Sequence, residues 1–341
     1  MIRFFLFQLA RIGLLCSAVF GTTLALKAAE PPGYYNSAAG LSGAALRSAL
    51  HNIIDGHTSI SYSDTRVPLE KLDEDPLNPA NVILLYERTS WPKWQFVSQD
   101  PDGWNREHCW PNSLGIDDDP PAHSDLFNLR ACGEPGNSDR ANLYYDESAP
   151  SAQGYEIPAG PTTPLCSEDF DSWEPPLEVK GDLARAMFYM DIRYEGGIGE
   201  PNLILTDNVN LITTSASYMG RLSLLLIWHF LDPVSPAERT RAEGAYQYQG
   251  NRNPFVDHPG YVERVYGDVF QLRVTRQNNF VVLSWPAIVP TDIGFIETST
   301  DLVQWTTATL TIVDQNGMHT ATVPISNGRQ FFRLKLRQRT G

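Results

Sequence analysis

The amino-acid sequence predicts an α+β domain over residues 30–266, followed by a small all-β domain over residues 268–341. Two observations lead to this division. Before residue 266, apolar residues recur at helical spacing in several segments. After it, short apolar runs are separated by turn-forming pairs such as Asn316-Gly317, which is typical of a β-sandwich. With 341 residues, the chain is long enough to bury two cores.

Residues 1–29 are predicted to be a secretory signal peptide. Arg3 and Arg11 accompany an apolar run over residues 12–20, and small residues offer cleavage positions near residues 25 and 29. The apolar run is too short to favour a membrane span. Cys16 is a candidate for a lipid anchor, but Leu15 before it does not fit the small residue that such sites prefer. We therefore expect a secreted or periplasmic protein without a membrane span once the signal is removed.

The first expected helix covers residues 41–54. Leu46, Leu50 and Ile54 fall on one face, and Gly56 follows as a stop signal. The other elements expected in this domain are a buried strand at 82–86, a helix from an N-cap at Asp182, a buried helix at 222–231 and a helix that starts with a capping box at Ser235. Residues 99–181 are rich in Pro, Gly, Asp and Asn. In a compact domain, so long an irregular region indicates a functional or cross-linked segment.

Three cysteines follow the signal segment, at Cys109, Cys132 and Cys166. In an oxidising compartment they allow one disulfide and leave one free thiol. We expect Cys132 to pair with Cys166, because Cys109 adjoins the candidate catalytic residue His108. A structural zinc site made from these four residues is an alternative, although no Cys-x-x-Cys pair supports it.

The charge of the first domain is strongly acidic. Residues 30–267 hold 16 basic and 35 acidic residues, which gives a net charge of −19. A protein that binds nucleic acid through phosphate neutralisation is usually basic. A protein of this composition that acts on nucleic acid needs a locally positive cleft, or salt and divalent ions that screen the repulsion. A solvated acidic surface that keeps the protein soluble is the alternative interpretation.

Glu107 and His108 are the residues with the most suggestive chemistry. A neutral histidine can take a proton from water, and a hard cation held by oxygen ligands can relieve the charge on a phosphodiester. Adjacent side chains of an extended segment point to opposite sides, so both serve one site only if the strand end twists or a loop follows. Pro111 ends any strand soon after. By itself, such a pair has a structural role more often than a catalytic one. Its role therefore has to be judged from the neighbouring residues.

The neighbouring residues resemble the bacterial endonuclease I family, which belongs to the His-Me finger (ββα-metal) nucleases. Five blocks occur in the order of that family, and together they cover roughly residues 34–263. They are NREHCWPNS at 105–113, SDLFNLR at 124–130, NSDRAN at 137–142, GDLARAMFYM at 181–190 and NRNPFVDHP at 251–259. The resemblance implies a His-Me finger nuclease domain with surrounding helices.

The resemblance also implies roles for single residues. His108 would be the general base that activates water. Glu107 and Asn137 would bind one Mg²⁺, for which Ca²⁺ or Mn²⁺ are candidate substitutes. Arg106 and Arg140 would contact phosphate, because a guanidinium matches phosphate oxygens; structural ion pairs are an equally weighted alternative for both. The expected product carries a 5′-phosphate.

The substrate implied is DNA, with RNA as a second candidate, and little sequence preference is expected because contacts to phosphate and metal read no bases. We expect a monomer. One departure from the family stands out: Phe127 occupies a position where members often have histidine. A catalytically weakened nucleic-acid-binding protein is therefore one alternative function, and a structural domain stabilised by zinc or a disulfide is another.

The C-terminal residues resemble a small immunoglobulin or fibronectin-like module of exported bacterial enzymes. The similar segments are VVLSWP at 281–286, ETSTDLVQW at 297–305 and FFRL at 331–334. Trp285 and Trp305 are expected in its core. Surface or polymer binding, substrate targeting and stabilisation are all open roles for this module.

Overall fold

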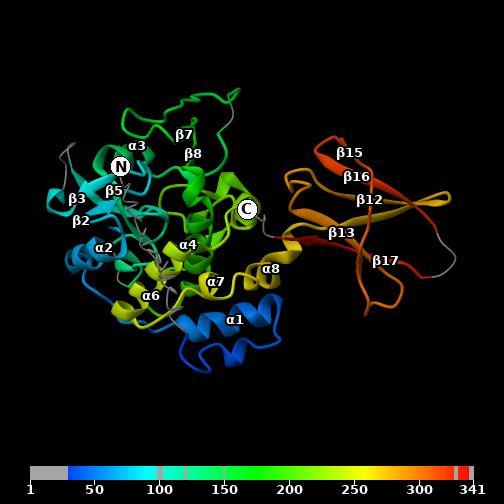
Figure 1. Ribbon diagram of the computed structural model, residues 1–341, viewed down its shortest axis with the longest axis horizontal. Helices are drawn as coiled ribbons and strands as arrows, with labels where there is room; N and C mark the ends of the chain where they lie inside the picture. Colours follow the sequence, from blue (N-terminus) through cyan, green and yellow to red (C-terminus); the bar gives the residue numbers. More distant parts are fainter. Residues whose placement is uncertain (1–29, 98–102, 119–120, 149, 326–328, 338–341) are drawn as a thin grey trace, which may run out of the picture.

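The structure is a computed structural model that describes residues 30–97, 103–118, 121–148, 150–325 and 329–337. The predicted signal peptide lies outside these residues. Figure 1 shows a first domain of helices and small sheets that ends at α8, and a separate β-sandwich beside it. Within the described ranges, no helix combines the length and the apolar character needed to cross a membrane.

The first domain is built mainly from helices. The α-helices are α1 (Gly43–Ile54), α2 (Arg66–Leu72), α3 (Glu134–Arg140), α4 (Lys180–Arg193), α5 (Leu222–Leu231), α6 (Pro236–Gln249), α7 (Pro254–Asp257) and α8 (Tyr261–Tyr266). The predicted helices at 41–54 and 222–231 are confirmed, and Leu46, Leu50 and Ile54 are buried. Ser235 caps α6 as expected, since its hydroxyl accepts a hydrogen bond of 3.0 Å from the Glu238 N–H.

Three expectations about this domain need correction. The strand predicted at 82–86 is instead β2 (Asn78–Ile83), and the buried residues that follow form a turn. α4 begins at Lys180, so Asp182 lies in its first turn instead of capping it. The Glu238 side chain does not complete a capping box, because its carboxylate binds the Arg185 guanidinium with two contacts of 2.6 Å.

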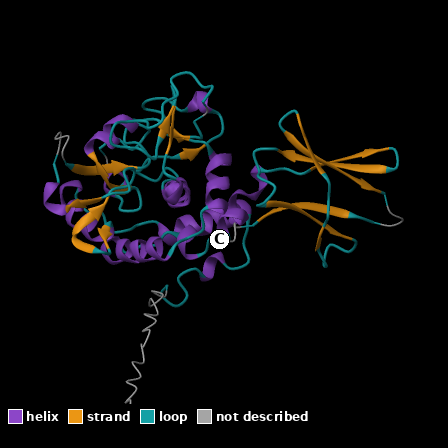
Figure 2. Ribbon diagram, turned by 45° about the horizontal axis from the view of Figure 1, so that its top comes forward, coloured by secondary structure: helices purple, strands orange, loops and turns teal. Residues whose placement is uncertain are grey.

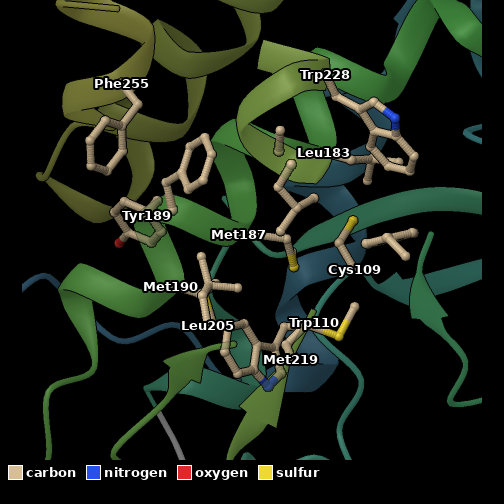
Figure 3. Close-up of a cluster of buried hydrophobic side chains, with 14 of the residues drawn as sticks. Cys109, Trp110, Leu183, Met187, Tyr189, Met190, Leu205, Met219, Trp228 and Phe255 are labelled. Carbon is tan, nitrogen blue, oxygen red and sulfur yellow. The ribbon is translucent and has the colours of Figure 1, made fainter. Parts of the chain in front are cut away.

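The core of the first domain lies around α4 and α5. Leu183, Met187 and Met190 of α4 are fully buried. Figure 3 shows them in one cluster with Cys109 and Trp110, the two residues that directly follow β4. Burial of these side chains supplies the main apolar driving force, and it anchors the chain at the end of β4.

Small sheets surround this core. β1 (Glu74–Asp75), β2 and β3 (Ser90–Pro92) form one antiparallel sheet in the order β1-β2-β3. β4 (Trp104–His108) and β5 (Leu129–Gly133) form an antiparallel pair. The remaining short strands are β6 (Tyr144–Tyr145), β7 (Ser167–Glu168) and β8 (Ser172–Glu174) in one sheet, and β9 (Ile204–Leu205) and β10 (Tyr218–Met219) in another. The described residues between 103 and 181 therefore contain five of these ten strands, β4 to β8, together with α3.

The C-terminal part is a sandwich of two sheets, as predicted. One sheet has the order β11 (Arg273–Gln277), β12 (Phe280–Pro286), β16 (Met318–Pro324) and β15 (Ile312–Gln315), and the other has the order β14 (Thr306–Thr307), β13 (Gly294–Ser299) and β17 (Phe331–Leu336). Figure 2 shows the two sheets facing each other. Trp285 is fully buried in the core, whereas Trp305 is half-exposed beneath the Arg333 guanidinium.

Apolar and charged contacts join the two domains. Leu334 and Leu336 of β17 line a small cavity together with Leu226 and Phe230 of α5. Beside it, the Lys335 ammonium pairs with the Glu263 carboxylate of α8. The sandwich thus packs against the helical side of the first domain.

Candidate active site

An antiparallel pair of strands and the helix that follows it carry all five residues that the sequence singles out. β4 pairs with β5 with Glu107 opposite Arg130 and His108 opposite Leu129, and α3 follows β5 directly. Arg106, Glu107 and His108 therefore end β4, while Asn137 and Arg140 lie one helical turn apart on the same side of α3. This β4-β5-α3 unit brings two sequence blocks that are nearly thirty residues apart into contact.

The ring of His108 is held in one orientation and is not sealed inside the core. It is half-buried, and its Nε2 lies 2.9 Å from the carbonyl oxygen of His123. Because a carbonyl only accepts, Nε2 carries the proton of the neutral ring and Nδ1 keeps a free lone pair. Burial lowers the pKa of His108 to about 4. At neutral pH the ring is therefore uncharged and can act as a base.

Aromatic rings fix the His108 side of the strand. The His123 ring stacks on His108 with centroids 5.0 Å apart, and Tyr62 stacks on both. Arg106 lies on this same side, with its guanidinium 3.9 Å from the centroid of the Tyr62 ring. The Arg106 guanidinium also donates to the Tyr62 carbonyl. Arg106 is half-buried, so its side chain, unlike that of Arg140, retains some exposure to solvent.

Glu107 lies on the opposite side of β4, where it is almost fully buried. Its Oε1 accepts hydrogen bonds from the Tyr86 hydroxyl at 2.7 Å and from Arg140 Nη1 at 3.1 Å. Burial raises the pKa of Glu107, and the charge of Arg140 opposes that rise. Oε2 receives no side-chain hydrogen bond from the part of the chain that the structure describes. Two side chains thus anchor one carboxylate oxygen, whereas the other is not held by a described side chain.

Asn137 is oriented so that its side-chain oxygen is the free atom. Its Nδ2 donates to Asn105 Oδ1 at 2.6 Å and to the Arg106 carbonyl at 3.1 Å. Both protons of the amide are used in these two bonds, so Oδ1 must point elsewhere. Asn105 and Glu107 are two residues apart and share one side of β4. Asn137 therefore meets the side of the strand that carries Glu107, and the two supply a carboxylate and an amide oxygen.

Arg140 is fully buried and serves the structure of the site. Besides Glu107, its guanidinium donates to the carbonyls of His108 at 2.9 Å and Cys109 at 2.8 Å, and it lies 4.9 Å from the Tyr145 ring centroid. These contacts match the structural ion pair that was the alternative for this residue. They use Nη1 and Nη2, and burial keeps the guanidinium from a direct phosphate contact.

The cysteines do not form the predicted bridge. Cys109, Cys132 and Cys166 are buried free thiols. The Cys132 thiol faces Glu87 Oε2 at 3.9 Å, while the Cys166 thiol faces the Tyr86 carbonyl at 3.8 Å. The predicted Cys132–Cys166 disulfide is thus absent, because the two thiols point at different acceptors. In the described ranges no three His, Cys, Asp or Glu side chains come together as a metal site, so the zinc alternative has no ligand set.

The second sequence block supports the domain core. Asp125 is fully buried and accepts hydrogen bonds of 2.8 Å from the hydroxyls of Tyr189 and Tyr194. The Phe127 ring packs against Tyr189 with centroids 4.7 Å apart. The unusual phenylalanine therefore lies against α4, and the rings that stack on His108 come from other residues.

Comparison with known proteins agrees with the arrangement of these blocks. Residues 42–260 match the family model described as Endonuclease I. The chain belongs to the endonuclease I family. Its membership in this family makes it a nuclease, an enzyme that cleaves nucleic acid.

Three similar proteins carry names that state an activity. An extracellular ribonuclease of Bacillus amyloliquefaciens is 46% identical over 70% of this chain and 79% of its own. An extracellular ribonuclease of Bacillus subtilis is 41% identical over 74% of this chain and 87% of its own. Endonuclease-1 of Buchnera aphidicola is 28% identical over 48% of this chain and 56% of its own.

Several residues of the site escaped the sequence analysis. Tyr62 and Tyr86 lie far from the motif in sequence and reach it only through the fold. Asn105 stands inside the motif, but nothing in the sequence distinguishes an amide that orients Asn137 from one that faces solvent. No local pattern marks such residues, because their role depends on contacts across the chain.

We predict that the three thiols are free and unreactive in the folded protein. Burial raises the pKa of Cys109 to about 12 and that of Cys132 well above its usual value, so little thiolate forms. Alkylation with iodoacetamide without reductant, followed by mass spectrometry of peptides, should label Cys109, Cys132 and Cys166 only after denaturation. Recovery of a linked Cys132–Cys166 peptide would contradict this assignment.

Proposed function

We propose that this family member is a secreted, Mg²⁺-dependent endonuclease with a His-Me finger and little sequence preference. The observation that supports it most is the orientation of His108, whose hydrogen bond to the His123 carbonyl leaves Nδ1 as a neutral base at the end of β4. The β4-β5-α3 order matches the strand-strand-helix arrangement that the fold name describes. The Glu107 side chain lies on the other side of this strand, and Asn137 of α3 contacts the strand there.

The oxygen atoms of Glu107 and Asn137 fit a hard divalent cation. Mg²⁺ prefers one or two carboxylate or amide oxygens and keeps water and phosphate oxygens as its other ligands. Glu107 Oε2 and Asn137 Oδ1 are the atoms that the internal hydrogen bonds leave free. When bound, the cation would offset the charge on the phosphate and ease departure of the 3′-oxygen.

The substrate would bind beside the C-terminal end of β4, where Glu107 and His108 lie. β5 pairs with one edge of this strand, and the other edge meets Phe96 and the side chains of Asn137 and Arg140. A phosphodiester at this end of the strand can meet His108 from one side and the Glu107 and Asn137 oxygens from the other. This placement resolves the difficulty that adjacent residues of a strand point in opposite directions.

The chemistry proposed for His108 is removal of a proton from water. Nδ1 takes the proton, the water oxygen forms a bond to phosphorus, and the bond from phosphorus to the 3′-oxygen breaks. The products are a 5′-phosphate and a 3′-hydroxyl, which takes up a proton as it leaves. Arg106 is the candidate for a phosphate contact, and Arg140 is assigned to hold Glu107 and the carbonyl of His108.

RNA and DNA are both proposed substrates. Two relatives are named extracellular ribonucleases and a third is named Endonuclease-1. The two names that include the word extracellular support secretion, in line with the predicted signal peptide. The site offers phosphate and metal contacts, which predict cleavage with little discrimination between sequences.

Replacement of His108 should remove most of the activity. A general base contributes a factor of about 100 to 10,000, so His108→Ala should lower kcat at least about 100-fold. The measurement is cleavage of RNA and nicking of plasmid DNA with Mg²⁺, with an EDTA blank. His51→Ala is a matched control. The His51 ring on α1 also forms a hydrogen bond with a backbone carbonyl, that of Ile192 on α4, but His51 lies outside the β4-β5-α3 unit. An unchanged rate in His108→Ala would remove the assignment, and binding without cleavage by the unmodified protein would favour the nucleic-acid-binding alternative.

The acid limb of the rate profile should lie well below the usual histidine range. His108 must be neutral to act, so activity is present above its pKa and is lost as the pH falls through about 4. The measurement is kcat/KM from pH 3.5 to 8 at saturating Mg²⁺, with circular dichroism at each pH to confirm that the fold persists. A limb near pH 6.5 would contradict the orientation and burial assigned to this ring.

A further inference from the structure

Several carboxylates around α3 have no cationic partner. Glu87, Asp139 and Glu168 take part in no ion pair with any described residue, although the domain has many ion pairs elsewhere. Burial, followed by the charge of Asp139, raises the pKa of Glu168. Part of the acidic excess of this domain thus lies around α3, where no arginine or lysine of the described ranges pairs with these carboxylates.

Glu87 is a buried carboxylate with one oxygen unbonded. Its residue is 6% exposed, and Oε2 accepts the Gly133 N–H at 3.2 Å, while Oε1 has no hydrogen-bond partner among the described residues. A Cβ at Gly136 would lie 2.4 Å from Oε1 and 2.9 Å from the methyl group of Thr163. Glycine at this position lets the carboxylate and the threonine approach the surface of α3.

Asp139 and Thr163 face each other on the same side of the helix. Thr163 is fully buried, and neither its hydroxyl nor Asp139 Oδ2 has a hydrogen-bond partner among the described residues. A Cβ at Gly160 would lie 1.7 Å from Asp139 Oδ2 and 3.1 Å from Thr163 Oγ1. Both oxygens therefore point into the space beside Gly160, which no side chain enters.

α3 thus has two functional faces. Asn137 and Arg140 contact β4, while Gly136 and Asp139, which are also three residues apart, face Glu87 and Thr163. The second face gathers two carboxylates and a hydroxyl from the turn after β2, from α3 and from the loop before β7. These are oxygen ligands, and buried oxygens without partners cost free energy unless something pairs with them.

We propose that Glu87, Asp139 and Thr163 form a second site for a hard divalent cation, with Ca²⁺ as the ion it fits. Oxygen ligands from separate segments suit the flexible coordination of Ca²⁺. A water molecule could donate to two of these oxygens, but it would leave both carboxylates without a cationic partner. The cation would tie the loop and the turn to α3, the helix that carries Asn137, so its role is structural. The proposal does not depend on the catalytic assignment.

The experiment measures the rise in melting temperature that Ca²⁺ produces relative to EDTA. A ligand at 100 times its Kd should raise the Tm of a domain of this size by about 5–10 °C. Asp139→Asn and Thr163→Val should lose most of that rise, whereas Asn137→Ala, which removes a proposed ligand of the catalytic cation, should retain most of it. Glu147→Gln, at an exposed carboxylate outside the cluster, is the matched control.

Thr163→Val keeps both carboxylates and the side-chain shape, so it tests the site even if Asp139→Asn folds poorly. Metal analysis after gel filtration in Ca²⁺ adds a second readout, in which the unmodified protein should hold one more Ca²⁺ than Thr163→Val. An absence of any Ca²⁺ effect, or equal effects in the unmodified protein and both variants, would overturn the proposal. Loss of activity in His108→Ala bears on the catalytic site alone, so the two proposals fail separately.

Discussion

The buried guanidinium of Arg140 is the constraint on which the site depends. It joins α3 to the last residues of β4 through Glu107 and the carbonyls of His108 and Cys109. Removing one partner of such a buried pair typically costs about 3–5 kcal/mol, because the other charge is left uncompensated. The pair therefore fixes the position of the helix relative to the strand, and with it the position of Asn137 relative to Glu107.

The end of β4 is held from three directions. Cys109 and Trp110 are buried in the cluster around α4, Arg140 binds from α3, and the His123 carbonyl bonds the ring of His108. Rigid support matters here, because catalytic groups lose much of their effect when they are displaced by about 1 Å. The two sides of the strand also have different surroundings: aromatic rings and Arg106 accompany His108, while hydrogen-bonding groups accompany Glu107. One strand thereby presents a neutral imidazole on one side and a carboxylate on the other.

The sequence was sufficient for the features that depend on local patterns. The helix at 222–231 is apolar all round and the cap at Ser235 is a short motif, so both could be predicted from their own residues. The site residues emerged from a family resemblance, since a Glu-His pair alone is weak evidence. Contacts between distant segments could not be predicted: nothing near Arg140 in the sequence separates a phosphate ligand from a buried ion pair. The disulfide prediction was wrong because it relied on compartment and cysteine count, whereas the thiols of Cys132 and Cys166 face different acceptors.

The most direct measurement of the central claim is anomalous diffraction from crystals of the protein with Mn²⁺ and a non-hydrolysable phosphorothioate oligonucleotide. The account predicts a Mn²⁺ peak bonded to Glu107 Oε2 and Asn137 Oδ1, with the phosphate beside the C-terminal end of β4 and a water within hydrogen-bonding distance of His108 Nδ1. A phosphate bound away from this end of the strand, with no Mn²⁺ at those two oxygens, would contradict it.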